Sequence, residues 1–133
     1  MPQHHLTGTF SVSMQPQPWP EAEAPGLTVG RLLLSKQYQG ELQATAQGQM
    51  LSAMTGVPGS AGYVAIEVVT GTLLGRAGSF ALQHRGVMDR GRPTLSVTVV
   101  PDSGNGELAG LAGTLGIRIE GGQHFYDFDC TLP

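Results

Sequence analysis

The clearest structural signal in the chain is the run Tyr63-Val64-Ala65-Ile66-Glu67-Val68-Val69-Thr70-Gly71-Thr72-Leu73. Its β-branched residues are typical of a strand, and its two apolar faces are typical of a strand that is covered on both sides. Gly75-Arg76-Ala77-Gly78 reads as a tight turn into Ser79–Val87, so the two runs predict a β-hairpin. We expect this hairpin to place Leu73 near Gly78 and Glu67 opposite His84, to within about one residue of register.

The remainder of the chain also reads as short alternating runs separated by turn residues, eight strands in all. With 20 glycines and 9 prolines in 133 residues, the chain has little room for helices, and only Gly106–Leu111 is expected to hold a helical turn. The three prolines of Gln15–Pro20 predict a loop that joins neither a helix nor a ladder. The expected strands are Leu6–Met14, Thr28–Gln39, Glu41–Met54, Tyr63–Leu73, Ser79–Val87, Thr94–Val100, Thr114–Ile119 and His124–Leu132.

Eight short strands with hairpin-length connections can close as a barrel or pack as a two-sheet sandwich. Glycines recur inside the strands, at Gly8, Gly71 and Gly116, where they allow a strand to bend at a barrel corner. The sequence therefore favours an all-β fold, an eight-stranded antiparallel β-barrel. We expect one domain over residues 1–133, with residues 1–5 frayed.

The composition excludes several classes of protein. The net charge is −3, with a single lysine and no cluster of arginines, which argues against nucleic-acid binding. No apolar run is long enough for a transmembrane helix, and the first residues lack the pattern of a signal peptide. The single cysteine, Cys130, suits a reducing compartment and reads as an inert buried thiol. We therefore expect a cytoplasmic protein without a membrane partner.

Three motifs carry a resemblance to a known family: Thr7-Gly8-Thr9-Phe10, the run from Val69 to Gly86, and the run from Val99 to Gly113. Together they resemble the DUF3224 family of uncharacterised bacterial proteins. The resemblance implies a barrel like that of allene oxide cyclases, which cyclise an unsaturated fatty-acid epoxide inside eight antiparallel strands. The place that matches the cyclases' functional carboxylate holds Met14-Gln15, so the resemblance implies the barrel rather than the cyclase chemistry.

Glu67 is the sharpest candidate for chemistry because it interrupts an apolar strand. Inside a barrel its pKa would be raised, and it would act as a general acid or base; alternatively it faces outward and pairs with an arginine such as Arg85. His84 shares a face with Phe80 and Leu82, so it lies either in the lumen or in the core as a hydrogen-bonded histidine. If they meet, Glu67 and His84 form a catalytic carboxylate–imidazole pair.

A second set of residues is suited to lining an apolar site, because aromatic and methionine side chains form adaptable walls. The alternative is that they are ordinary core residues. This candidate ligand-binding set is Trp19, Tyr38, Met50, Tyr63 and Phe80.

The sequence predicts no cofactor and no metal. Gly104-Asn105-Gly106-Glu107-Leu108-Ala109 matches a dinucleotide motif in letters, but Gly110 and Gly113 exclude the long helix that the motif requires. Candidate metal ligands do occur near the two ends of the chain, where a solvated face is the simpler interpretation. They are His4, His5, His124, Asp127 and Asp129.

The leading interpretation is a barrel that binds a small, largely apolar molecule in its lumen, since eight strands leave room for one small ligand. One alternative is an isomerase or cyclase that uses Glu67 and His84. The other is a structural or interaction barrel with a filled interior. The two-faced apolarity of Tyr63–Leu73 and of Leu95–Val100 further predicts a homo-oligomer, either a dimer or a trimer.

Overall fold

The structure is a computed structural model that describes residues 2–133. Most of the described chain is in antiparallel strands, with one short 3-10 turn at Pro20–Ala22. The strands are β1 (Gln3–Gln17), β2 (Leu27–Gly40), β3 (Leu42–Thr55), β4 (Ala61–Leu73), β5 (Arg76–Asp89), β6 (Arg92–Val99), β7 (Asn105–Gly106), β8 (Ala112–Glu120) and β9 (Gln123–Thr131).

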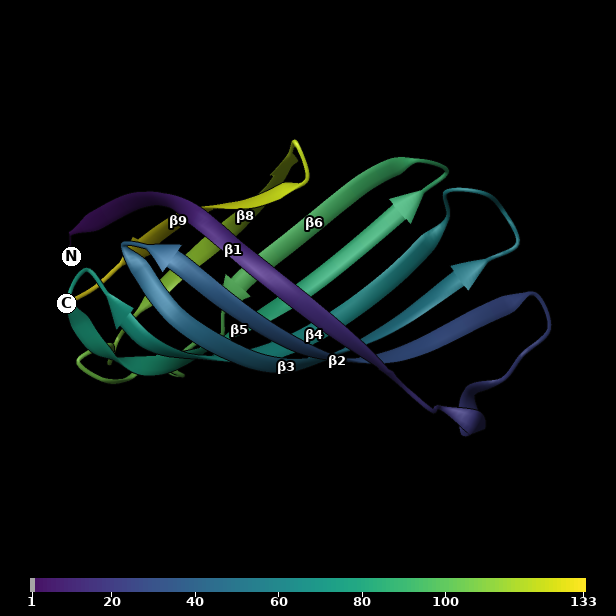
Figure 1. Cartoon of the computed structure of the whole chain (residues 1–133), viewed down its shortest axis with the longest axis horizontal. Coiled ribbons are helices and arrows are strands. Elements are labelled where there is room, and N and C mark those ends of the chain that lie inside the picture. The colour runs from purple at the N-terminus through teal and green to yellow at the C-terminus, as the bar shows by residue number, and fades with distance from the viewer. Residues whose placement is uncertain (1) are drawn as a thin grey trace.

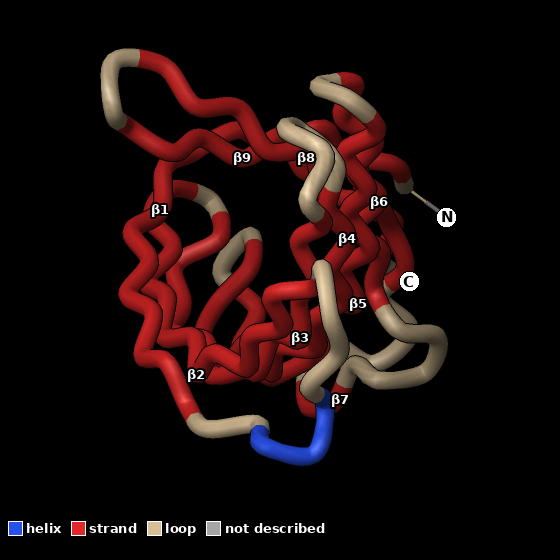
Figure 2. Tube along the Cα trace, turned by 90° about the vertical axis from the view of Figure 1, so that its right-hand side faces the viewer, coloured by secondary structure: helices blue, strands red, loops and turns tan. Residues whose placement is uncertain are grey.

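Eight of these strands close into a barrel. The strand order is β4-β3-β2-β1-β9-β8-β6-β5, and β5 pairs again with β4 to complete the ring (Figures 1 and 2). The two-residue strand β7 is an addition that pairs with β5. The predicted fold, an eight-stranded antiparallel β-barrel, is confirmed. The shortest pairing between neighbouring strands of the barrel is that of β6 with β8, where Thr98 pairs with Thr114.

One end of the barrel is filled with side chains. Inward-facing residues from every long strand meet there, and the loop before β8 adds Leu108 and Leu111 as a plug. Both chain termini lie at this end (Figure 1), where Leu132 is buried in the same core. At the opposite end, residues 2–133 form no such plug, and a cavity opens there. The core therefore anchors the barrel at one end and leaves the other available for a site.

The β4–β5 hairpin has a tighter turn than the sequence suggested. Leu74 and Gly75 form a two-residue turn with φ values of 53° and 77°, so that Leu73 pairs with Arg76. The predicted register, with Glu67 opposite His84, is wrong by two residues: Glu67 pairs with Leu82. A two-residue turn of this kind matches the twist of the strands. It places Leu74 at a positive φ, which is unfavourable for leucine, and the spacing of the glycines did not indicate a turn at that position. A shift of two residues keeps every side chain on its predicted face.

The proline-rich segment differs from its prediction in two ways. Pro16 lies within β1 and pairs with Leu32 of β2, and Pro20 begins the 3-10 turn. A ladder tolerates proline here because the described pairing of β1 with β9 ends at Phe10, which leaves the later part of β1 as an edge. Proline is also well suited to the first position of a helical turn. The segment Gly106–Leu111, where a helical turn was expected, forms overlapping hydrogen-bonded turns and no helix.

The start of the chain is also more ordered than predicted. Residues 3–5 are not frayed, because they pair in register with residues 129–131 of β9. Without this pairing the end of β9 would expose unpaired backbone groups along one edge.

The outer surface of β4 is apolar, as the sequence predicted, whereas that of β6 is not. Val64, Ile66 and Val68 point outward and are each about half exposed. In β6, Val97 and Val99 point into the core, while Ser96 and Thr98 lie on the outer face. The expectation of a homo-oligomer stays a prediction. Across residues 2–133, no helix has the length and apolar character needed to span a membrane.

Two of the three predicted bend glycines have no room for a side chain. A Cβ built on Gly71 would lie 2.3 Å from the Gln43 carbonyl oxygen, and one on Gly8 would lie 2.3 Å from the Gln39 carbonyl oxygen. Gly116 is different, because the nearest atoms to its Cβ belong to Asp127 at an ordinary 3.8 Å.

Replacing Gly71 by alanine should therefore destabilise the barrel by about 1–3 kcal/mol, since the clash is with rigid backbone on the neighbouring strand. The matched variant Gly116→Ala should change stability by less than about 1 kcal/mol. Urea unfolding of both variants measures the difference. If the two variants were equally stable, the close approach of the neighbouring strand would not be the reason that glycine is needed at position 71.

Candidate functional site

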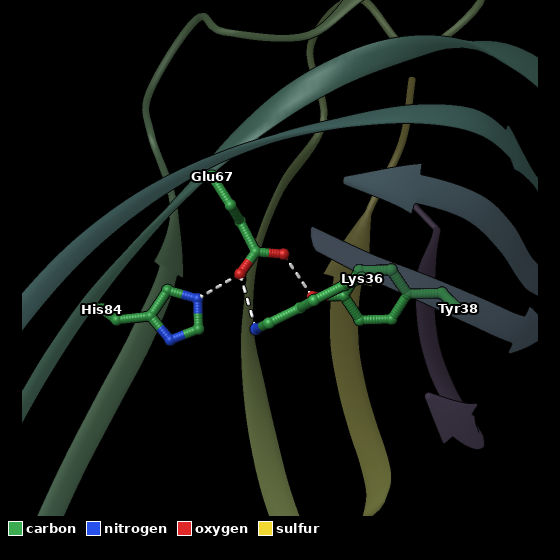
Figure 3. Close-up of polar contacts among 4 residues, drawn as sticks. All are labelled: Lys36, Tyr38, Glu67 and His84. Carbon is green, nitrogen blue, oxygen red and sulfur yellow. Dashed lines mark hydrogen bonds and ion pairs between the residues drawn. The ribbon is translucent and has the colours of Figure 1, made fainter. Parts of the chain in front are cut away.

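Four polar side chains converge inside the barrel, midway between the filled and open ends. Lys36 and Tyr38 come from β2, Glu67 from β4 and His84 from β5 (Figure 3). Each reaches the interior because inward and outward positions alternate along its strand. The β4–β5 register makes Glu67 and His84 diagonal neighbours, which is close enough for long side chains to touch.

Glu67 is the centre of this cluster. Its Oε2 atom accepts a hydrogen bond from Lys36 Nζ at 2.7 Å and lies 2.7 Å from His84 Nε2. Its Oε1 atom accepts a hydrogen bond from the Tyr38 hydroxyl. The Glu67 side chain is only 1% exposed, so these three neighbours replace the water that a carboxylate otherwise requires. The outward pairing with Arg85 that the sequence left open does not occur.

The electrostatics of Glu67 are the reverse of the prediction. Burial by itself would raise the pKa of Glu67. The hydrogen bond with His84, the charge and hydrogen bond of Lys36 and the Tyr38 hydroxyl outweigh burial and lower that pKa to about 2. The predicted raised pKa is therefore wrong, because the sequence showed the apolar strand but not the cation beside it. Glu67 is a permanent anion at neutral pH and has no proton to donate.

The side chains around Glu67 offer its carboxylate hydrogen-bond donors. Burial, followed by the nearby Glu67 charge, raises the pKa of Tyr38, so its phenol stays protonated and donates. Lys36 Nζ also lies 5.2 Å from the centre of the Phe10 ring, where a cation is attracted to the aromatic face. Because Glu67 is ionised, His84 Nε2 must carry the hydrogen of their shared bond.

A cavity of about 240 Å³ extends from this cluster toward the open end of the barrel. It runs from a buried floor to an exposed rim, since His84 is 3% exposed and Ile119 is 65% exposed. Apart from Lys36, His84, His124 and the Tyr63 hydroxyl, its wall is apolar. The lining residues are Phe10, Val12, Met14, Leu34, Lys36, Met50, Tyr63, Ala65, His84, Leu95, Ile117, Ile119 and His124.

The second ring nitrogen of His84 faces this cavity. In Figure 3, Nδ1 points away from Glu67, and no residue of the described chain hydrogen-bonds to it. Among residues 2–133, every fully buried side-chain nitrogen or oxygen has a partner. Nδ1 is therefore not fully buried, and the space that it reaches is the cavity that His84 lines. With Nε2 carrying the hydrogen, neutral His84 presents a lone pair there.

The structure brings together most, but not all, of the residues predicted for the site. Glu67, His84 and Tyr38 form the buried cluster, and Met50 and Tyr63 line the cavity.

The other two predicted ligand-binding residues lie elsewhere. Phe80 is four residues closer to the hairpin turn than His84, so it packs against Phe128 in the filled end. Trp19 lies on the outer surface beside Leu51 and Val64, because the loop that carries it folds over the outside of the sheet.

Lys36 is the member of the buried cluster that the sequence interpretation missed. It is the only lysine of the chain and occupies the inward face of β2 together with Leu34 and Tyr38. A lysine in that alternating series was a usable signal, since lysine is almost never buried without a partner.

The candidate metal ligands do not converge. His5 Nδ1 contacts Asp129 Oδ1 on the exposed surface, whereas His124 packs against the Phe10 ring inside the cavity. Asp127 accepts a hydrogen bond from Arg118. Across residues 2–133, no three histidine, cysteine or acidic side chains are grouped as a metal site requires.

The fold and the site together define a small closed β-barrel with a buried charged cluster beneath an open-ended cavity. The family model described as "Protein of unknown function (DUF3224)" matches residues 6–130, and the chain belongs to this family. It is 51% identical to a DUF3224-family protein of unknown function from Shewanella oneidensis MR-1. The crystal structure of that protein aligns over 99% of both chains with a TM-score of 0.95. No curated protein matches the chain.

These comparisons confirm the family that the sequence motifs predicted. The further resemblance to allene oxide cyclases is not confirmed and stays a prediction.

Glu67→Gln should destabilise the protein by about 3–5 kcal/mol, because it leaves the Lys36 ammonium buried without an anion. The double variant Glu67→Gln/Lys36→Met should recover most of that loss, since it removes both charges and fills the space with an apolar side chain of similar length. Urea unfolding at neutral pH measures both. If the single variant were as stable as the double variant, the proposed dependence of Lys36 on the carboxylate would be incorrect.

The stability contributed by Glu67 should also depend on pH. Its pKa is lower in the folded state, about 2, than the ordinary value of 4.5, so the stabilisation is complete above about pH 5 and is lost as the pH falls from there toward 2. The loss should amount to roughly 3 kcal/mol. Unfolding titrations of the wild type and the Glu67→Gln/Lys36→Met variant isolate this part from the other carboxylates. Parallel pH curves would contradict the assignment.

Proposed function

We propose that this protein binds a small, largely apolar molecule, with a hydrogen-bond acceptor at one end, in the cavity of the barrel. The observation that carries this proposal is the cavity's composition: an apolar wall that ends on Lys36 and His84. Ligand sites commonly combine a mainly apolar surface with a few polar groups that fix orientation.

The size of the cavity limits the ligand. At roughly 30 Å³ for each water of liquid volume, 240 Å³ corresponds to about eight waters. A compact molecule of roughly 8–12 non-hydrogen atoms fits this space. The exposed rim, which includes Met14 and Ile119, allows a longer apolar tail to extend toward solvent.

The floor of the cavity favours an acceptor. Lys36 has three N–H donors and gives one to Glu67, so the others are free to meet a ligand oxygen. Glu67 itself lies behind Lys36 and His84 and is nearly unexposed, which keeps its negative charge from direct contact with the ligand. A molecule with a carbonyl or similar oxygen at its inner end therefore matches the site.

A filled barrel with only a structural role fits the cavity end less well. The interior residues there are exposed at Met14, Leu95 and Ile119 rather than packed by a plug of the kind that Leu108 and Leu111 form at the other end. Exposed apolar side chains around a concave opening are typical of a binding site.

Methionine methyl groups offer a direct test of binding. Acetophenone, a small apolar ketone, should shift the methyl NMR signals of Met14 and Met50, which line the cavity. Met54 and Met88 lie outside it and are exposed, so they serve as internal references. Ala65→Phe places a ring in the cavity and should abolish the shifts. Val64→Phe adds the same ring to the outer face and should leave them unchanged.

The proposal predicts that the Met14 and Met50 signals move together and saturate with increasing acetophenone. Shifts of all methionine signals in proportion, or shifts that persist unchanged in Ala65→Phe, would show surface association and overturn it.

A further inference from the structure

The contacts of His84 with Glu67 on one side and the cavity on the other support a catalytic role. We propose, building on the binding function above, that the cavity catalyses proton transfer at the carbon next to a carbonyl group. In this proposal His84 Nδ1 is the general base, Lys36 holds the carbonyl oxygen, and Glu67 is a positioning residue. The substrate class is a small apolar ketone or enone.

The base is oriented and uncovered. Glu67 Oε2 lies 2.7 Å from His84 Nε2, which fixes the ring and the tautomer that leaves a lone pair on Nδ1. When Nδ1 takes up a proton, the imidazolium is directly beside a buried carboxylate that stays ionised. This arrangement favours the protonated product of the first step.

The group that stabilises the developing negative charge is close to the base. Lys36 and His84 line the floor of the same cavity, and both contact Glu67 Oε2 at 2.7 Å, so their side chains lie close together. One small molecule at the floor can therefore touch both residues. An ammonium placed before the reaction at the carbonyl oxygen stabilises an enolate, and it does so more strongly where the apolar wall excludes water.

The step balances without any other reactant. The Nδ1 lone pair takes a proton from the α-carbon, the electrons of that C–H bond form a carbon–carbon double bond, and the carbonyl π electrons move to oxygen beside Lys36. The reverse flow of electrons takes the proton back from Nδ1. If the Nδ1 proton first exchanges with a solvent deuteron, return at the α-carbon gives isotope exchange. Return at the γ-carbon of a β,γ-unsaturated ketone gives the conjugated isomer.

The described wall of the cavity lacks the aliphatic hydroxyl and thiol nucleophiles that would suggest acyl transfer. The lining residues within the described chain include no serine, threonine or cysteine, so a hydroxyl or thiol nucleophile of those types is missing from the wall. Cys130 is buried in the filled end, where burial raises its pKa and keeps the thiol protonated.

Deuterium exchange tests the proposal. In heavy water, the wild type should incorporate deuterium into the methyl group of acetophenone at least about 10²-fold faster than the same concentration of free imidazole. His84→Gln keeps an N–H for Glu67 but has no basic nitrogen, and should lose this acceleration. Binding is read in the same samples from the Met14 and Met50 methyl shifts, which His84→Gln should retain.

A β,γ-unsaturated cyclohexenone provides the second readout, because its conjugated isomer absorbs in the ultraviolet. If His84→Gln does not fold, His84→Ala with added imidazole replaces it. Imidazole should restore the exchange in His84→Ala, where it can enter the cavity, and should not restore it in the Ala65→Phe variant, where the cavity is filled.

Glu67 acts through His84, so its role has a separate test. Glu67→Gln should lower kcat per folded molecule and leave the KM for acetophenone nearly unchanged, since the anion beside the protonated ring is gone. A purely structural role would lower the rate only in proportion to the folded fraction.

The two proposals fail in different ways. If acetophenone shifts Met14 and Met50 but exchanges no faster than with free imidazole, the catalytic inference is overturned and the binding function stands. If no shifts occur, the binding function fails and the inference fails with it.

Discussion

The hydrogen bonds to the Glu67 carboxylate are the interaction on which the organisation of this barrel depends. A charged carboxylate in an apolar interior is strongly unfavourable unless its lone pairs are satisfied, and three side chains from two other strands do so. The cluster thereby links β2, β4 and β5 by side chains. Backbone pairing decides which strands are neighbours. The Glu67 cluster decides which side chains of β2, β4 and β5 contact each other in the interior.

The cluster also lies at a boundary within the barrel. On one side, Leu42, Leu73 and Phe128 belong to a packed core that is closed by the loop before β8. On the other side the cavity begins, and apolar side chains become progressively exposed toward the rim. Gly8 and Gly71, where neighbouring strands approach closely, lie beside the packed half. The core supplies the stability that allows the opposite half to remain unfilled.

The alternating pattern was sufficient to predict eight strands, their faces and the barrel. The pattern placed Glu67 and His84 on facing positions of one hairpin, and a register error of two residues does not change their faces. It left open whether that face points into the barrel or outward toward Arg85. What the pattern could not provide was the turn at Leu74-Gly75, since a leucine with positive φ has no simple sequence signal. The pattern also could not place Trp19, because its loop folds across the outside of the sheet and contacts residues far away in the sequence.

The largest error of interpretation concerned Lys36. It was visible in the sequence as the one lysine, in an inward series with Leu34 and Tyr38, yet its effect on Glu67 depends on the pairing of β2 with β3 and of β3 with β4. The pKa of Glu67 therefore moved in the opposite direction from the one predicted by burial alone. A titratable group inside a barrel takes its charge state from the strands opposite it as much as from its own strand.

Stability alone does not account for such a cluster. Replacing a buried ion pair by apolar residues of similar volume is often neutral or stabilising, so a barrel of this size folds without one. The Glu67 cluster is placed where its cation and its imidazole, but not its carboxylate, border the cavity. That arrangement exposes a donor and a basic nitrogen to a bound molecule and keeps the anion behind them. A structural ion pair needs no contact with the cavity, whereas the proposed site uses this order, with Lys36 at the carbonyl oxygen and His84 beside the adjacent carbon.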